Sequence, residues 1–309
     1  MAPSSTLALD MVSHPELKCT SYPMPKKAFP ENASPSSKLN LSTAELKETA
    51  KKLRRHVITM IATAGSGHPG GSLSAADIIT ALYFRVLRHH PENPRWPERD
   101  RFILSKGHAA PILYAALAEA GYFPVAELET LRKMDSRLQG HTDMNLTPGV
   151  EMSAGSLGMG LSFAIGVALA ARLDSRTYRT YALLSDGECE EGETWEAALA
   201  AAHFRVDNLT AMVDCNGMQL SGWTRDIMNL EPLVRKWQAF GWHVIDIDGH
   251  DLDQIIAAFL KAEKMKGKPT VIIARTTKGK GVSFMENNVA FHGKTPTREE
   301  AEKALKELK

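Results

Sequence analysis

The sequence predicts an α/β protein with a mostly parallel sheet sandwiched by helices, and three observations carry this prediction. Short apolar runs alternate with stretches that have helical spacing. The apolar runs are continuous, which is typical of parallel strands covered on both faces. No internal repeat or linker interrupts residues 41–290, so we expect one domain. In such sheets the ligand lies at the carboxyl ends of the strands.

Composition narrows the class of protein further. Of 309 residues, 43% are hydrophobic and 24% are charged, which is ordinary for a globular protein. A net charge of +1 argues against a dedicated nucleic-acid binder. No apolar run reaches the roughly eighteen residues of a membrane helix. Three cysteines without C-x-x-C spacing indicate neither a disulfide framework nor a zinc site. We therefore expect a cytoplasmic protein.

Residues 1–40 differ from the rest of the chain. They hold six of the sixteen prolines and seven serines, but no Arg and no sustained apolar periodicity. Such a segment cannot bury enough apolar surface to offset the entropy of ordering it. It also lacks the apolar core of a secretory signal and the arginines of a transit peptide. We predict a flexible arm over 1–40 and a folded domain over 41–309.

The folded part opens with helices. Ser42 and Glu45 form a capping-box pattern, followed by apolar residues at helical spacing. This helix is expected to stop in the Gly- and Pro-rich run at 65–71, and the next to run from Ser74 to about Leu87.

Strands and helices then alternate. The apolar runs predict five strands, at 101–105, 181–185, 210–214, 243–247 and 270–274. Helical spacing predicts helices at roughly 157–172, 192–204 and 251–265. The charged tail, 298–309, is expected to be a solvated surface helix.

Polar residues at two predicted strand ends suggest a cation site. Asp186 and Gly187 follow one strand, and Asn216 follows the next, 216 − 186 = 30 residues later. Carboxylate and amide oxygens are the hard ligands that Mg²⁺ or Ca²⁺ prefers, and magnesium often adds phosphate oxygens. An Asp-Gly pair alone is usually a turn. The two strand ends together predict a site.

This spacing resembles the fingerprint of thiamine-diphosphate enzymes, G-D-G followed about thirty residues later by Asn. Here Ser185 replaces the first Gly, and Cys215 precedes the Asn. Further segments resemble the transketolase family in its order. They are Ser66-Gly67-His68-Pro69-Gly70, Ser105-Lys106-Gly107-His108-Ala109, Gly140-His141 with 155–160, Glu190-Glu191-Gly192 with Glu196, and Thr277–Gly281 with Phe291-His292-Gly293-Lys294. The likeness covers about 45–296.

The resemblance implies how a cofactor and metal would be held. Asp186, Asn216 and the main-chain carbonyl of Met218 would bind Mg²⁺ or Ca²⁺, which would hold the diphosphate of thiamine diphosphate. Gly187 would let the backbone approach a phosphate oxygen. The aminopyrimidine end would lie against the backbone of Gly155, Ser156 and Leu157.

Four of the eleven histidines stand directly beside glycine in loops and match family positions. The resemblance implies that His68 and His292 bracket the reacting hydroxyl of a ketose, and that His292 also touches the cofactor. His108 would touch the cofactor phosphate, and His141 would bind a substrate hydroxyl. Imidazole suits these roles because it exchanges protons near neutral pH. The other seven are interpreted as structural: His14, His56, His89, His90, His203, His243 and His250.

The resemblance also implies a partner. Glu191 and Glu196 would be carboxylates buried at a subunit interface that links two active sites, whereas Glu190 and Glu193 are interpreted as solvated. The family's activating Glu lies in a pyrimidine-binding domain C-terminal to everything matched here. We therefore expect the pyrophosphate-binding subunit of a split transketolase, which works with a partner subunit in an α2β2 assembly. It would pass a two-carbon ketol unit from a ketose donor, with or without phosphate, to an aldose.

Three other functions are weighed. One is a subunit of a related thiamine-diphosphate enzyme, such as 1-deoxyxylulose-5-phosphate synthase or an α-keto acid dehydrogenase. The Gly-His-Pro-Gly segment and His292-Gly293-Lys294 favour transketolase. Another is a non-catalytic subunit that binds the cofactor, against which the intact ligand set argues. A P-loop enzyme fails because no G-x-x-x-x-G-K-[ST] occurs. The donor and acceptor sugars stay open.

Overall fold

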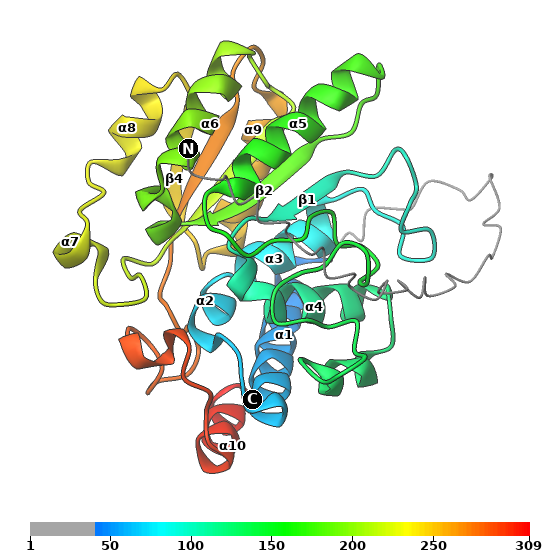
Figure 1. Cartoon of the computed structure of the whole chain (residues 1–309), viewed down its shortest axis with the longest axis vertical. Coiled ribbons are helices and arrows are strands. Elements are labelled where there is room, and N and C mark those ends of the chain that lie inside the picture. The colour runs from blue at the N-terminus through cyan, green and yellow to red at the C-terminus, as the bar shows by residue number, and fades with distance from the viewer. Residues whose placement is uncertain (1–40) are drawn as a thin grey trace, which may run out of the picture. The chain divides into compact units, whose positions relative to one another are not determined.

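A computed structural model describes residues 41–309, and a five-stranded parallel sheet lies at its centre (Figure 1). The strands are β1 (Arg101–Leu104), β2 (Thr180–Ser185), β3 (Leu209–Cys215), β4 (His243–Asp248) and β5 (Thr270–Arg275). They lie in the order β1-β2-β3-β5-β4, and every neighbouring pair is parallel. The predicted α/β class and all five predicted strands are confirmed.

The sheet is covered on both faces, which explains why its strands read as continuous apolar runs. On β2, Tyr181 and Leu183 join one buried cluster, while Ala182 and Leu184 join the other. Because successive side chains of a strand point to opposite faces, an apolar residue is needed at every position. Figure 1 shows α5 and α6 on one side of the strands and α1 to α4 on the other.

One helical layer is built from the N-terminal half of the domain together with α9. It comprises α1 (Thr43–Ala64), α2 (Pro69–Ser74), α3 (Ala76–Ala81), a π-helical turn η1 (Leu82–Val86), α4 (Ala110–Ala120) and α9 (Leu252–Lys264). The predicted capping box at Ser42 and Glu45 is present, and Gly65 ends α1 with φ 62°. That positive φ is the left-handed conformation that Gly adopts without strain.

The second helix does not begin at Ser74 as predicted. Helical structure resumes at Pro69 and continues, with a break at Ala75, to Val86. Proline is suited to the first turn of a helix, because its missing N–H would have no partner there in any case. The Gly- and Pro-rich run therefore both ends α1 and starts α2. Helix α4 was not predicted from the sequence.

The other layer consists of α5 (Met159–Leu173), α6 (Gly192–His203) and α8 (Leu233–Ala239), with the short α7 (Thr224–Ile227) nearby in the chain. Short η elements lie at Gly107–Ala109, Val125–Thr130, Gly187–Glu190 and Val289–His292. The tail forms α10 (Arg298–Glu307). It is not solvated on every side, because Ala301, Ala304 and Leu308 are buried against the first layer.

Two further expectations concern the N-terminal arm and membrane-spanning helices. The arm predicted over 1–40 lies outside the residues that the structure describes. Within 41–309, no helix is both long enough and apolar enough to cross a lipid bilayer.

Candidate active site

Asp186 and Asn216 lie at the carboxyl ends of β2 and β3, which are neighbours in the sheet. One carboxylate oxygen of Asp186 accepts a hydrogen bond from Gly187 N at 2.9 Å, and the other accepts one from Gly217 N. The Asn216 side-chain oxygen accepts from Met218 N at 3.1 Å. The structure thus brings together the predicted metal-binding residues, with the Met218 main chain held by the Asn216 side chain.

Asp186 is a buried carboxylate that lies close to a second carboxylate. It is 1% exposed, and burial together with the nearby Asp214 raises its pKa to about 7. A divalent cation would supply the missing positive charge. Within 41–309 no group of three or more His, Cys, Asp or Glu could hold a metal. The candidate set instead joins one carboxylate, one amide and one carbonyl, which fits Mg²⁺ or Ca²⁺.

The four loop histidines gather beside this strand edge. The ring centroid of His68 lies 5.5 Å from that of His108, 6.3 Å from His141 and 5.6 Å from His292. His108 and His292 are stacked, with centroids 5.3 Å apart. These residues come from four segments far apart in the chain, so the cluster exists only in the folded domain.

The histidine rings are held neutral. Burial, aided by Arg132, His141 and Lys278, lowers the pKa of His68 to about 4. Burial and the Lys278 ammonium lower the pKa of His292 to about 3. Burial, followed by the Lys106 ammonium, also lowers the pKa of His108. Nδ1 of His68 is buried and has no hydrogen-bond partner among residues 41–309. A neutral ring with an unpartnered nitrogen is suited to binding a ligand hydroxyl or phosphate.

Lys278 lies at the centre of the site, although no role was predicted for it from the sequence. It is buried, and its Nζ donates to His292 Nδ1 at 2.8 Å and to the Met218 carbonyl at 3.1 Å. Burial lowers its pKa to about 8. A buried ammonium directed at the loops of Met218 and His292 fits an anionic ligand such as a diphosphate. The sequence did offer one sign of this role, because Lys278 precedes Gly279 in the loop that follows a predicted strand.

A second buried lysine forms the floor of the site. Lys106 pairs with Asp214, both fully buried, and donates to the Gly71 carbonyl at 2.8 Å. Although burial raises the pKa of Asp214, the Lys106 ammonium holds it below its usual value. A Cβ on Gly71 would lie 3.3 Å from His108 Nε2, so glycine lets this ring approach.

Gly155, Ser156 and Leu157 lie in the loop that leads into α5, where a Cβ on Gly155 would lie 4.0 Å from the His141 ring. A Cβ on Gly107 would lie 2.8 Å from Ala154 Cβ, so glycine there lets the two loops pack together. Buried Glu188 holds the end of this loop, because its carboxylate accepts hydrogen bonds from Ser105, Gly158 N and Ser185 N. This role of Glu188 was not predicted from the sequence.

Glu191 and Glu196 lie at the start of α6 and are exposed in the single chain. Glu190 and Glu193 are half-buried and not solvated as interpreted. Glu193 accepts a hydrogen bond from Ser162, and Glu190 Oε1 is buried with no hydrogen-bond partner in the part of the chain that the structure describes.

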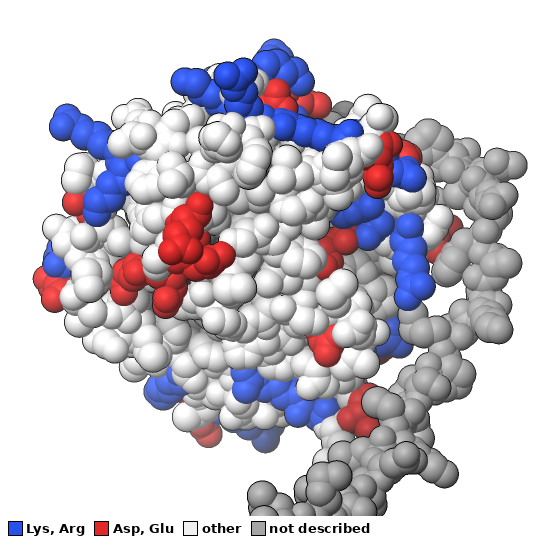
Figure 2. All heavy atoms as spheres, turned by 45° about the horizontal axis from the view of Figure 1, so that its top comes forward, with Lys and Arg blue, Asp and Glu red and all other residues white. Residues whose placement is uncertain are grey.

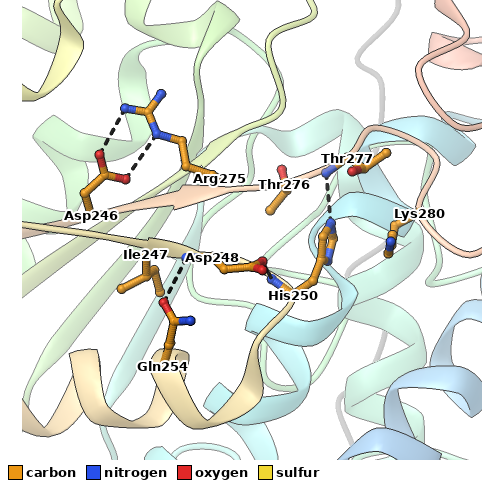
Figure 3. Close-up of a pocket in the computed structure, with 9 residues that line it drawn as sticks. All are labelled: Asp246, Ile247, Asp248, His250, Gln254, Arg275, Thr276, Thr277 and Lys280. Atoms are coloured by element: carbon orange, nitrogen blue, oxygen red, sulfur yellow. Dashed lines mark hydrogen bonds and ion pairs between the residues drawn. The ribbon is translucent and has the colours of Figure 1, made fainter.

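A cavity of about 590 Å³ lies beside this cluster, at the carboxyl ends of β4 and β5 (Figure 3). Its lining includes His250, Arg275, Thr276 and Thr277, but none of the predicted site residues. Arg275 is already paired with Asp246 on the neighbouring strand. The four loop histidines, Asp186, Asn216 and Lys278 therefore do not line this cavity, although Thr277, the residue before Lys278, does.

Comparison of this chain with known proteins points to one family. A family model described as the thiamine diphosphate binding domain of transketolase matches residues 46–308. The 6-deoxy-6-sulfo-D-fructose transketolase subunit SqwG of Clostridium sp. (strain MSTE9) is 47% identical over 264 residues, covering 85% of this chain and 96% of that protein. One subunit of the apulose-4-phosphate transketolase of Actinobacillus succinogenes is 46% identical over 271 residues, covering 87% of this chain and 98% of that protein.

Longer proteins match over part of their length. Human transketolase is 42% identical over 264 residues, which are 85% of this chain but 42% of that protein. The crystal structure of transketolase from Campylobacter jejuni superimposes with a TM-score of 0.82 at 34% identity, covering 87% of this chain and 43% of that one. The chain therefore spans about two fifths of these longer proteins and nearly all of the subunits named above.

Proposed function

This chain belongs to the transketolase family and is a transketolase subunit, and from that premise we propose that it binds the diphosphate of thiamine diphosphate through a divalent cation. The observation that supports this most is the convergence of neutral histidines and the buried Lys278 on the loops of Asp186 and Asn216. The proposed reaction transfers a two-carbon ketol unit from a ketose to an aldose.

In the proposed site, Asp186, Asn216 and the Met218 carbonyl bind Mg²⁺ or Ca²⁺. His108 and Lys278 bind the phosphate oxygens, since the buried Lys278 ammonium donates to two uncharged groups, the Met218 carbonyl and the His292 ring. Gly187 lies in the same loop, where a Cβ would come 2.8 Å from Gln219 Cβ. The backbone at 155–157 holds the other end of the cofactor.

The histidines act on the sugar. When bound, thiamine diphosphate supplies the carbon nucleophile and the electron sink for breaking the ketose C–C bond. His292 accepts from Lys278 at Nδ1, so its neutral ring carries the proton on Nε2 and can donate it to a sugar oxygen. His68, with an unpartnered Nδ1, can accept the proton of a hydroxyl. His141, the exposed member, binds a further substrate hydroxyl.

The sugars for which two relatives are named support an anionic sugar as the substrate of this chain. One relative is named for a sulfonated fructose and another for apulose-4-phosphate. For this chain we propose a ketose that carries a phosphate or sulfonate group. The cytoplasm is the proposed location, in agreement with the free thiols of Cys189 and Cys215.

We propose that the active assembly contains a partner chain with the pyrimidine-binding domain, as α2β2. Two copies of the present chain would meet through the α5–α6 face, defined by Met159, Phe163 and Leu199 together with Glu191 and Glu196. Met159 and Leu199 are 46% and 62% exposed. Figure 2 shows a broad uncharged area on this side with acidic side chains in its middle. Apolar side chains that gather in one exposed patch, unlike singly scattered ones, are typical of a protein–protein interface.

The cofactor proposal is tested by calorimetric titration of the chain. Thiamine diphosphate is added with Mg²⁺ and, separately, with EDTA, and thiamine monophosphate with Mg²⁺ is the matched control ligand. We expect saturable binding only of the diphosphate in the presence of Mg²⁺. Equal binding with EDTA would contradict the metal site, and equal binding of the monophosphate would contradict the diphosphate site.

A further inference from the structure

His250 has contacts beyond those of an ordinary structural histidine. It follows β4 and lies between α3 and the loop after β5 (Figure 3). Its Nδ1 lies 2.8 Å from the Asp77 carboxylate, and its Nε2 lies 2.8 Å from the main-chain nitrogen of Thr277. Both ring nitrogens are therefore used, one toward a side chain and one toward the backbone.

These partners define where the ring proton lies. A backbone N–H can only donate, so Nε2 must accept from Thr277 and carry no proton. Nδ1 then donates to Asp77, which favours this tautomer because a carboxylate accepts. Asp77 is itself fixed by two hydrogen bonds from Arg54, at 3.0 and 2.6 Å. The chain Arg54–Asp77–His250 therefore presents one oriented acceptor to Thr277.

The loop held in this way is anchored on both sides of Thr277. Thr276 N donates to the Cys215 carbonyl at 3.1 Å, and Gly279 N donates to the Gly70 carbonyl at 3.0 Å. The Thr276 hydroxyl donates to Asp214. Between these two contacts, the main-chain nitrogen of Thr277 is held by the His250 side chain.

The peptide that His250 fixes leads directly to Lys278. A Cβ on Gly70 would lie 3.1 Å from Lys278 Cγ, so the stem of the lysine runs through a narrow passage. At its end, Nζ reaches both His292 Nδ1 and the Met218 carbonyl. If the Thr277 peptide could rotate, the Lys278 side chain would change direction, and its Nζ would separate from these two groups.

We propose that His250 is a positioning residue that, through the Thr277 main chain, aims the Lys278 ammonium at the cofactor diphosphate. This inference rests on the proposed function for the identity of the ligand. The orientation of Lys278 itself rests on the contacts above and can be measured without cofactor.

Two isosteric variants separate the two ring contacts. In His250→Asn, the side-chain amide nitrogen can take the place of Nδ1 and donate to Asp77, but Thr277 N loses its acceptor. In His250→Gln, the side-chain oxygen reaches the place of Nε2 and keeps that acceptor. A purely structural histidine held by Asp77 would tolerate Asn better than Gln. The proposal expects the reverse.

The first measurements use the full chain without cofactor. Hydrogen exchange of the peptide spanning 276–279 is expected to be about tenfold faster in His250→Asn, as for loss of one hydrogen bond, and near wild type in His250→Gln. Acetylation of Lys278, followed by mass spectrometry, is expected to rise only in His250→Asn. Equal rates in both variants, or faster rates in His250→Gln, would overturn the proposal.

The second measurement is the Kd for thiamine diphosphate with Mg²⁺. We expect an increase of about three- to tenfold in His250→Asn and less than about twofold in His250→Gln. His243→Asn, the same change at the other end of β4, is the matched control and is expected to match wild type in exchange, labelling and Kd. Absence of binding by the wild-type chain would contradict the proposed function. Unchanged binding in His250→Asn would contradict the role of His250.

Discussion

Asp186 is buried next to a second carboxylate, Asp214, and both lie under loops that carry buried lysines. At the residue scale, the first prediction concerns Asp186→Asn. Asn keeps an acceptor for Gly217 N but lacks the charge that a divalent cation requires. Thiamine diphosphate at about a hundred times its Kd stabilises the wild-type chain by roughly 2.7 kcal/mol, and we expect this gain to vanish in the variant. Thermal unfolding with Mg²⁺, with and without cofactor, measures it.

The control for this experiment is Asp226→Asn, which removes an exposed carboxylate on α7. It is expected to keep the full cofactor-dependent rise in unfolding temperature. If the cofactor stabilised the Asp186→Asn chain as much as wild type, Asp186 would not belong to the proposed metal site.

The second residue-scale prediction concerns the pH dependence of stability. The folded-state pKa of His68 is about 4, below the ordinary value of 6.5, mainly through burial. Below pH 6.5 the unfolded chain binds a proton at His68 that the folded chain does not. The contribution of this group to stability is therefore complete above pH 6.5 and is lost as the pH falls toward 4. In His68→Asn the free energy of unfolding should fall less between pH 7.5 and pH 5.

Urea unfolding at the two pH values measures this difference. His203→Asn, at the exposed end of α6, serves as the control and should show the wild-type pH dependence. If the free energy of unfolding of His68→Asn changed with pH as much as that of wild type, His68 would not be held neutral by the fold.

The sequence revealed some of these residues and not others for a physical reason. Asp186, Asn216 and the loop histidines stand close to Gly at strand ends or in loops, so their place is visible locally. Lys106 and Asp214 pair across 108 positions of the chain. Nothing in the residues around either one indicates that its charge is buried and paired. For the same reason, the contact between His250 and Thr277 could not be read from the sequence.

At the scale of an element, α5 depends on a glycine where it crosses the end of β1. A Cβ on Gly160 would overlap Ser105, which also binds Glu188. Gly160→Ala should therefore destabilise the chain by about 1–3 kcal/mol, the usual cost of overpacking. Gly166 lies on the same helix, is exposed and has no atom within 4 Å of a Cβ.

Gly166→Ala thus provides a control of opposite sign, expected to stabilise the chain by about 0.5–1 kcal/mol through helix propensity. The free energy of unfolding in urea is the measurement for both variants. Equal stability of the two alanine variants would show that α5 can move away from Ser105 at no cost.

Elements were predicted where their apolar pattern was strong. Strands β2, β3 and β5 were found because burial on both faces produces apolar runs, whereas β4 is only partly buried and was found from its three apolar residues. The start of α2 was misplaced because Pro69 and the glycines after it look like a break, although Pro is favourable in a first helical turn. The order of β5 and β4 in the sheet was not predicted, although Asp246 and Asp248 in β4 are typical of an edge strand and β5 is buried.

At the scale of the whole molecule, the present chain is expected to show negligible ketol transfer alone. Activity should appear when a partner chain with the pyrimidine-binding domain is added with thiamine diphosphate and Mg²⁺. A ketol-transfer assay on each chain and on the mixture measures this. Full activity of the isolated chain would contradict the split-enzyme proposal.

The α5–α6 face gives a prediction about assembly. Leu199→Asp places a charge at the centre of the proposed contact between two copies and should shift the chain toward monomers. Leu260→Asp, on α9 in the opposite helical layer and 52% exposed, is the matched control and should leave the oligomeric state unchanged. Sedimentation velocity at several concentrations measures both variants. Equal behaviour of the two variants would place the contact elsewhere.

The strand order also has a consequence for how the chain acquires its structure during synthesis. β4 precedes β5 in the chain, but its only strand neighbour within the described residues is β5, which lies between it and β3. β4 thus has no strand to pair with until residue 275 has been made, and a waiting strand edge is prone to aggregate. When β5 inserts, this interval ends, and Lys278 reaches the loops of Met218 and His292 in the same event. Completion of the sheet and formation of the proposed diphosphate site are therefore expected to be a single late step of folding.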